Sequence, residues 1–223
     1  DVYKSRESLL RHYLPAARKR IASSQFLIDL IINNDYQNIL SLGAGEGVKE
    51  YWLKMNLPEK SRVVSTDFDP FITNKAKEFF PEILVEQFDF VKGDIEAFQN
   101  KMNIEFDLAI FFGSSYVMDD EEFIRVFANL RKIGIKNIVD FQAGYIGLWS
   151  FFRTYLIPMT IRTSPTVRKI LRKPALPSEN YRGKFHGYER TRGELRKLYK
   201  KSGWKIQKDS FKDVSNKYIA LLG

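Results

Sequence analysis

The stretch Asn38-Ile-Leu-Ser-Leu-Gly43-Ala-Gly45-Glu-Gly47 joins a short apolar strand to a turn in which three glycines alternate with other residues. A second apolar segment, residues 62–66, ends directly before Asp67. Glycine lets the chain turn tightly and lets a ligand approach the bare backbone. The helix after such a turn offers free N–H groups, and an acid that ends the second strand can bind two ribose hydroxyls. This order predicts a nucleotide-binding half-site.

Strand and helix patterns alternate on both sides of this segment. Such alternation predicts an α/β fold with a parallel sheet and right-handed crossovers. The expected strands are 38–42, 62–66, 86–91, 106–112 and 137–141, and the helices between them are 46–55, 70–80 and 119–131. We expect Asp69, which precedes a proline, to cap the helix that begins at Pro70. A helix from Thr191 and two short strands, within 203–208 and 217–222, close the pattern.

The length of 223 residues suits one decorated domain. We expect residues 1–35 to form a helical leader and 36–143 the cofactor-binding half. Residues 144–190 would be an insertion or lid, and 191–223 the closing helix and strands. Because the sequence does not begin with Met, we expect an upstream part to have been removed.

The composition excludes several kinds of chemistry. The chain has no cysteine, so it has no disulfide, zinc–thiolate site or cysteine nucleophile, and we expect no metal site. The absence of cysteine fits a cytoplasmic protein. The longest apolar stretch, 138–161, includes Asp140, Gln142 and Arg153, which makes it too polar for a membrane-spanning helix.

The net charge of +9 is concentrated in the C-terminal part of the chain. Residues 144–223 contain 18 Lys and Arg against 5 Asp and Glu. A basic face attracts phosphorylated small molecules, anionic lipid surfaces or nucleic acid. A solvated surface without a binding role explains the same charge, because no run of five basic residues occurs.

With these elements placed, the chain resembles class I S-adenosylmethionine-dependent methyltransferases over about 38–142 and 191–222. The resemblance implies a Rossmann-like, doubly wound, seven-stranded sheet that is mostly parallel and has an antiparallel last strand. It also implies S-adenosylmethionine as the cofactor and S-adenosylhomocysteine as the product.

The resemblance further implies a set of cofactor-binding residues. The turn would pack under the amino acid part of the cofactor, Asp67 would hold the ribose, and Phe68 would flank the adenine. The acid after strand three would reach the adenine amine, and the exit of strand four would lie beside the methyl group and the acceptor. The residues so assigned are Gly43, Ala44, Gly45, Asp67, Phe68, Asp94, Ile95, Phe112, Gly113 and Ser114.

One position departs from the family pattern. The family often has Asp or Glu two residues before the first glycine, where this chain has Ser41. That acid helps to order the amino acid end of the cofactor, so the detail of this contact is open. A nicotinamide-binding domain is the competing fold, but its GxGxxG or GxGxxA motif needs a small residue where this chain has Val48.

Two residues are candidates for catalysis. Because a sulfonium already activates the methyl group, alignment is the main task, and a general base helps only where the acceptor must lose a proton. Tyr116, just beyond strand four, could orient an acceptor, or its ring could pack under the insertion. His186, at the end of the insertion, could act as a base or be an ordinary loop histidine.

The insertion holds five aromatic residues within 145–155, followed by scattered Arg and Lys. It could close over an acceptor with an anionic part, lie on an anionic membrane surface, or stack RNA bases. We therefore expect methyl transfer to a small-molecule or lipid-linked acceptor with an anionic part, with possible membrane-surface contact. RNA methylation is the alternative, and a non-catalytic cofactor-binding subunit is the second.

Overall fold

The computed structural model describes residues 5–12, 25–142, 187–188, 190–210 and 218–223. Within the predicted leader, residues 6–12 are helical, and α2 spans Gln25–Asn33. The predicted insertion lies outside the described residues except for its last few positions. Within the described part, no helix is long and apolar enough to cross a membrane.

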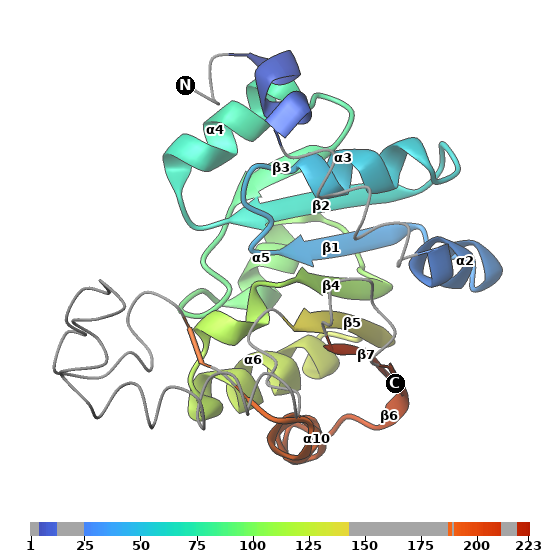
Figure 1. The fold of residues 1–223 in the computed structure, drawn as a ribbon, viewed down its shortest axis with the longest axis vertical. Coiled ribbons are helices and arrows are strands. Elements are labelled where there is room, and N and C mark those ends of the chain that lie inside the picture. The colour runs from blue at the N-terminus through green and yellow to red at the C-terminus, as the bar shows by residue number, and fades with distance from the viewer. Residues whose placement is uncertain (1–4, 13–24, 143–186, 189, 211–217) are drawn as a thin grey trace, which may run out of the picture.

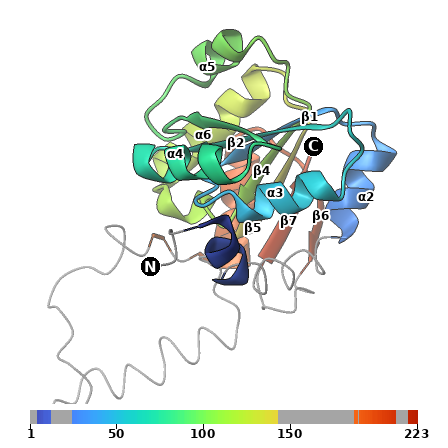
Figure 2. The same cartoon turned by 90° about the horizontal axis from the view of Figure 1, so that it is seen from above.

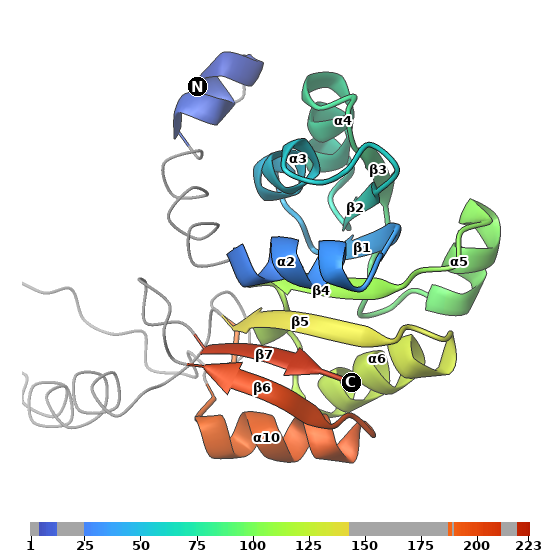
Figure 3. The same ribbon diagram turned by 90° about the vertical axis from the view of Figure 1, so that its right-hand side faces the viewer.

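A seven-stranded sheet forms the centre of the fold, in the order β3-β2-β1-β4-β5-β7-β6 (Figure 1). The strands are β1 (Asn38–Leu42), β2 (Arg62–Asp67), β3 (Leu84–Gln87), β4 (Leu108–Phe112), β5 (Asn137–Gln142), β6 (Ile206–Ser210) and β7 (Tyr218–Leu222). The first five run parallel, whereas β7 lies antiparallel to both β5 and β6, as their arrows show in Figure 3. The predicted doubly wound sheet with an antiparallel last strand is thus confirmed.

Helices cover both faces of the sheet (Figure 2). They are α3 (Val48–Met55), α4 (Pro70–Phe79), α5 (Ile95–Met102), α6 (Asp120–Lys132) and α10 (Arg192–Lys201), with a short 3-10 helix, η2, at Ser115–Val117. One apolar core joins the sheet to α2, α3 and α4, and a second joins it to α5, α6 and α10. Strands β4 and β5 are buried along their whole length because both layers cover them.

Acidic and hydroxyl side chains fix where several helices begin. The Asp69 carboxylate accepts hydrogen bonds from the N–H groups of Phe71 and Ile72, so the predicted cap of α4 is confirmed. Asp119 and Thr191 each form a capping box with a glutamate three residues later. Such caps satisfy N–H groups that have no partner within the helix.

The third strand differs from its prediction. The alternation over 86–91 predicted a strand there, but β3 is Leu84–Gln87 and pairs with β2 from Val64 to Asp67. Asp89 ends the extended run, because its carboxylate accepts hydrogen bonds from the N–H groups of Val91 and Lys92 and closes a turn. Phe88 and Phe90, whose alternation is like that of a strand, extend from this turn and pack into the core.

Candidate functional site

The glycine turn lies at the carboxyl end of β1, the edge at which open α/β sheets bind ligands. Gly43, Gly45 and Gly47 all have positive φ, near +65°, a backbone conformation that other residues rarely adopt. Gly47 caps α3, so this helix begins two residues later than predicted. The N–H of Ala44 donates to the carbonyl of Thr66 over 2.8 Å and fixes the turn against β2.

The first two glycines have opposite surroundings. A Cβ on Gly43 would lie 2.6 Å from Cβ of Ser114 and 2.9 Å from the ring of Phe90, so this residue lets the exits of β1 and β4 meet. A Cβ on Gly45 would have no atom of the described residues within 4 Å. The turn is therefore closely packed at Gly43 and open at Gly45, as a backbone that receives a ligand requires.

Asp67, at the end of β2, faces the open part of the turn. Its Oδ2 accepts a hydrogen bond from the N–H of Gly45 over 2.9 Å, and its Oδ1 accepts one from the N–H of Asp69 over 3.1 Å. The next side chain, Phe68, is 67% exposed, which is unusual for a phenylalanine. A partly buried carboxylate beside an exposed aromatic ring provides partners for a ribose diol and for a flat base.

The loop between β3 and α5 brings Asp94 and Ile95 to the same edge of the sheet. Asp94 caps α5, since its Oδ1 accepts hydrogen bonds from the N–H groups of Glu96 and Ala97. Ile95 is buried, and Gly93 sits so tightly that a Cβ there would lie 2.6 Å from the carbonyl oxygen of Asp89. The local structure thus gives Asp94 a capping role in addition to the adenine contact predicted for it.

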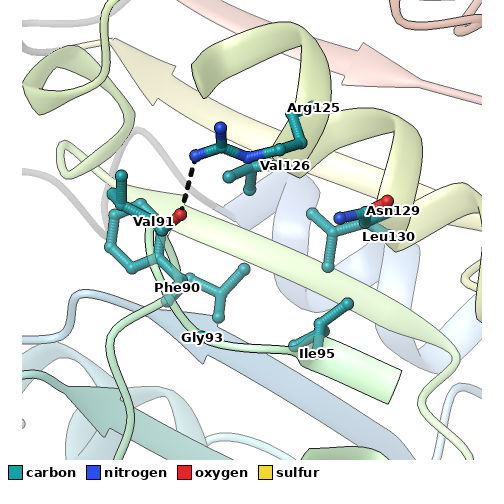
Figure 4. Close-up of a pocket in the computed structure, with 9 residues that line it drawn as sticks. Phe90, Val91, Gly93, Ile95, Arg125, Val126, Asn129 and Leu130 are labelled. Carbon is teal, nitrogen blue, oxygen red and sulfur yellow. Dashed lines mark hydrogen bonds between the residues drawn. The ribbon is translucent and has the colours of Figure 1, made fainter. Parts of the chain in front are cut away.

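A small pocket opens behind this loop, between it and α6 (Figure 4). The guanidinium of Arg125 donates to the carbonyl of Val91 over 2.9 Å and holds the loop against the helix. The pocket is lined by Leu42, Phe90, Val91, Gly93, Ile95, Arg125, Val126, Asn129 and Leu130. Because neither the glycines of the turn nor Asp67 line it, this pocket is separate from the open face at Gly45.

The exit of β4 completes this edge. The Ser114 hydroxyl donates to the carbonyl of Leu42, and the ring of Phe112 stacks on Phe141 at 5.0 Å between centroids. Lys49, from the first turn of α3, donates to the carbonyl of Phe112 over 2.9 Å. An ammonium group therefore lies at the exit of β4, a contact that the sequence analysis did not anticipate.

Tyr116 lies in η2, where the chain returns after the predicted insertion. The N–H of Tyr188 donates to the carbonyl of Tyr116 over 2.6 Å, and Gly187 packs so closely on the Tyr116 ring that a Cβ there would overlap it. The described residues on the two sides of the predicted insertion therefore lie at the end of β5 and at the exit of β4. His186, the other catalytic candidate, lies outside the described residues.

A buried polar network supports η2 from below. Asp140, on β5, accepts hydrogen bonds from Ser115 at 2.6 Å, Gln142 at 2.6 Å and Tyr199 at 2.7 Å. Burial raises the pKa of Asp140 to about 6, although the three donors and the positive charge of Arg190 lower it. The network joins β5, η2 and α10, which suits a structural role for Asp140.

The sequence analysis also missed Glu50. This residue lies in the first turn of α3, is fully buried, and accepts a hydrogen bond of 2.7 Å from the hydroxyl of Ser41. The sequence signal was indirect, since Ser41 is a small polar residue between the apolar residues Leu40 and Leu42. Among the described residues, no group of three or more His, Asp and Glu side chains is arranged to hold a metal ion.

Comparisons with known proteins agree with this architecture. A sequence model described as a methyltransferase domain matches residues 39–134. The sequence has no significant match among curated proteins. Similar solved structures include the mitomycin 7-O-methyltransferase (TM-score 0.56, 14% identity), which covers 84% of this chain. Human N-acetylserotonin methyltransferase in complex with S-adenosylmethionine covers 99% of it (TM-score 0.60, 15% identity).

Magnesium protoporphyrin IX methyltransferase from Synechocystis PCC 6803, with S-adenosylhomocysteine bound, covers 93% of this chain (TM-score 0.57, 13% identity). The chain spans 82% of that protein, but only 49% of the mitomycin enzyme and 57% of the human enzyme. At these identities the structures show the fold, and the methyltransferase-domain match covers residues 39–134. The open glycine turn, the acid that ends β2 and the exposed aromatic ring beside it fit the family's cofactor, S-adenosylmethionine. Residues 39–134 thus match a methyltransferase domain, and the sheet is the one that the resemblance to class I S-adenosylmethionine-dependent methyltransferases implied.

Proposed function

We propose that this chain transfers a methyl group from S-adenosylmethionine to a small-molecule acceptor, free or lipid-linked, that carries an anionic group. The observation that carries the proposal is the junction of Tyr116 with Gly187 and Tyr188. It places residues 187–188 at the exit of β4, at the edge of the sheet where the glycine turn is open. Tyr116, Gly187 and Tyr188 therefore lie together where this proposal places the acceptor.

In this proposal each part of the edge binds one part of the cofactor. Gly43, Ala44 and Gly45 receive the amino acid end, Asp67 binds the ribose diol, and Phe68 covers one face of the adenine. Asp94 and the backbone of Ile95 contact the edge of the adenine, and Phe112, Gly113 and Ser114 border the transfer position. When bound, the cofactor supplies a methyl group that its positive sulfur already activates.

The chain's own residues then need to place the acceptor and to manage its proton. Tyr116 is the residue proposed to orient the acceptor atom, and His186 is proposed as a base. Arg190 supports an anionic acceptor, because its side chain is only 4% exposed and its Nη1 has no hydrogen-bond partner among the described residues. Its other groups bind Asp120 and the carbonyl of Met118. A buried donor without a partner is costly unless a ligand satisfies it.

Calorimetry with S-adenosylmethionine and S-adenosylhomocysteine tests the cofactor site. We expect Asp67→Ala to weaken the binding of both ligands by about tenfold or more, since the carboxylate that would accept hydrogen bonds from two ribose hydroxyls is lost. Asp67→Asn is the matched control, because its amide oxygen can still accept from the N–H of Gly45. Binding by Asp67→Ala that equals the wild type would refute the assignment.

The acceptor is tested by formation of S-adenosylhomocysteine with three panels. These are hydroxylated small molecules with and without a carboxylate or phosphate, vesicles that contain anionic lipid, and RNA. We expect turnover with anionic small molecules or with lipid-linked acceptors in the vesicles. Turnover with RNA alone, at a rate that falls steeply with added salt, would favour the alternative. Cofactor binding without turnover on any panel would favour a non-catalytic subunit.

A further inference from the structure

Glu50 is a fully buried carboxylate beneath the glycine turn. Its Oε1 accepts the hydrogen bond from Ser41, which lies two residues before Gly43, and neither side chain is exposed. Its Oε2 is also buried but has no hydrogen-bond partner among the described residues. Burial of a carboxylate with one oxygen unsatisfied costs several kcal/mol, so its presence needs an explanation beyond packing.

The charges around Glu50 act in both directions. Burial raises the pKa of Glu50, and the neighbouring charge of Glu46 does so weakly, whereas Lys49 and the Ser41 hydroxyl lower it. A positive charge bound above the turn would also favour the ionised carboxylate. Ionisation of Glu50 and binding of a cation at the turn therefore favour each other.

Glu50 lies near the start of α3, where its charge acts on any ligand bound at the glycine turn. The first turn of a helix carries about half a positive charge, and a glycine turn that opens such a helix usually receives anions such as phosphates. Glu50 is the third residue of α3 and lies on its buried side, towards β1. A carboxylate held there at low dielectric offsets the charge of the helix and that of Lys49, and so lowers the potential at the turn.

We propose that Glu50 is a positioning residue that makes the glycine turn select a ligand whose amino acid end carries an ammonium group. Ser41 holds the carboxylate in place from the strand. The inference rests on the proposed function, since it assigns the amino acid end of S-adenosylmethionine to this turn. It adds the residue that gives the turn its preference for a cation and explains why the unsatisfied oxygen is kept.

Three ligands separate this role from a structural one. S-adenosylmethionine carries a sulfonium group and an amino acid end with one ammonium and one carboxylate group. S-adenosylhomocysteine lacks only the sulfonium charge, and 5′-methylthioadenosine lacks the sulfonium and the whole amino acid end but keeps the ribose and adenine. Glu50→Gln keeps the size of the side chain and the acceptor for Ser41. By calorimetry, we expect this variant to bind the first two ligands about tenfold more weakly, the effect of one charge-assisted interaction. Its affinity for 5′-methylthioadenosine should change less than twofold.

Two further variants complete the test. Glu59→Gln, in the exposed loop beyond the other end of α3, removes the same charge and should leave all three affinities unchanged. Ser41→Asp combined with Glu50→Ala moves the carboxylate from the helix to the strand and should restore the preference for S-adenosylhomocysteine over 5′-methylthioadenosine. If Glu50→Gln does not fold, the double variant provides the test. A double variant that shows no preference for S-adenosylhomocysteine over 5′-methylthioadenosine would contradict the inference.

Equal weakening of all three ligands by Glu50→Gln would show a purely structural role and overturn the inference, as would unchanged affinities. Failure of the wild-type chain to bind S-adenosylhomocysteine is a different result. It would reject the proposed cofactor site itself, whatever the variants do.

Discussion

The carboxylate of Asp67 accepts a hydrogen bond of 2.9 Å from the backbone N–H of Gly45, so the ends of β1 and β2 are joined at the turn. The group proposed to bind the ribose thus also helps to hold the turn. A change at Asp67 alters both, whereas changes at the glycines separate the shape of the turn from its contact with a ligand.

Gly43→Ala and Gly45→Ala should fail in different ways. Both place alanine at positive φ, which costs about 1–2 kcal/mol of stability. Gly43→Ala also forces its Cβ against Ser114 and Phe90, so its total loss should be about 3 kcal/mol or more by urea unfolding. Gly45→Ala should lose only the about 1–2 kcal/mol of stability that the positive φ costs. It should nevertheless weaken S-adenosylhomocysteine binding clearly, because its Cβ occupies the open face of the turn. Equal stabilities of the two variants would contradict this difference in packing.

Asp69→Ala should affect stability without affecting the cofactor. The Asp69 carboxylate caps α4 through two backbone N–H groups, and loss of such a cap costs about 1 kcal/mol. We expect a lower midpoint in urea and an unchanged dissociation constant for S-adenosylhomocysteine. A large loss of affinity in this variant would mean that Asp69, and not Asp67, is the acid that contacts the ligand.

The sequence predicted those parts of the fold that local chemistry determines. The glycine turn and the cap at Asp69 follow from short-range patterns, and the seven-stranded sheet was implied by the resemblance to the family. The third strand was misplaced because Phe88 and Phe90 alternate as in a strand, while the turn at Asp89 depends on a side-chain hydrogen bond that alternation does not reveal.

Contacts between distant elements could not be predicted. Glu50 looks like an ordinary helix glutamate until α3 is packed on β1, and only then does its bond to Ser41 become visible. The junction of Tyr116 with Tyr188 likewise depends on the return path of the chain. Periodicity gives the face of an element but not the partner of a buried polar group.

Asp140→Asn should change how stability depends on pH. Burial raises the pKa of Asp140 from 3.8 to about 6, so the folded state keeps its proton when the unfolded state has lost it. The contribution of Asp140 to the stability of the wild type should therefore fall by about 2–3 kcal/mol as the pH rises from about 4 to about 6. Asparagine stays neutral, and its amide N–H can donate to the buried Oε1 of Gln142.

Thermal unfolding of both proteins between pH 4 and 7 checks this prediction. The variant should gain stability over the wild type as the pH rises. A constant difference across this range would mean that Asp140 does not titrate there.

Asp209→Asn should show the opposite dependence on pH. The Asp209 carboxylate, on β6, accepts hydrogen bonds from Arg192 and Arg196 of α10 and from the hydroxyl of Tyr218 on β7. These donors hold the pKa of Asp209 well below its usual range. The stabilisation is present above the unfolded pKa of about 4 and is lost as the pH falls through the folded value.

At pH 7 the loss in Asp209→Asn should be about 1–2 kcal/mol, since both arginines are partly exposed to solvent. Urea unfolding at pH 7 and at pH 3 provides the measurement. A difference between variant and wild type that grows towards pH 3 would contradict the assignment.

Tyr116→Phe separates a role in transfer from a role in packing. The ring of Tyr116 packs against Gly187 and its backbone binds Tyr188, so phenylalanine should keep the fold and the stability. If the hydroxyl orients the acceptor, turnover should fall by about tenfold or more while the affinity for S-adenosylmethionine stays unchanged. The measurement is single-turnover methyl transfer with an acceptor from the anionic panel, and calorimetry serves as the control. Full turnover in Tyr116→Phe would assign the ring to packing and leave His186 as the remaining catalytic candidate.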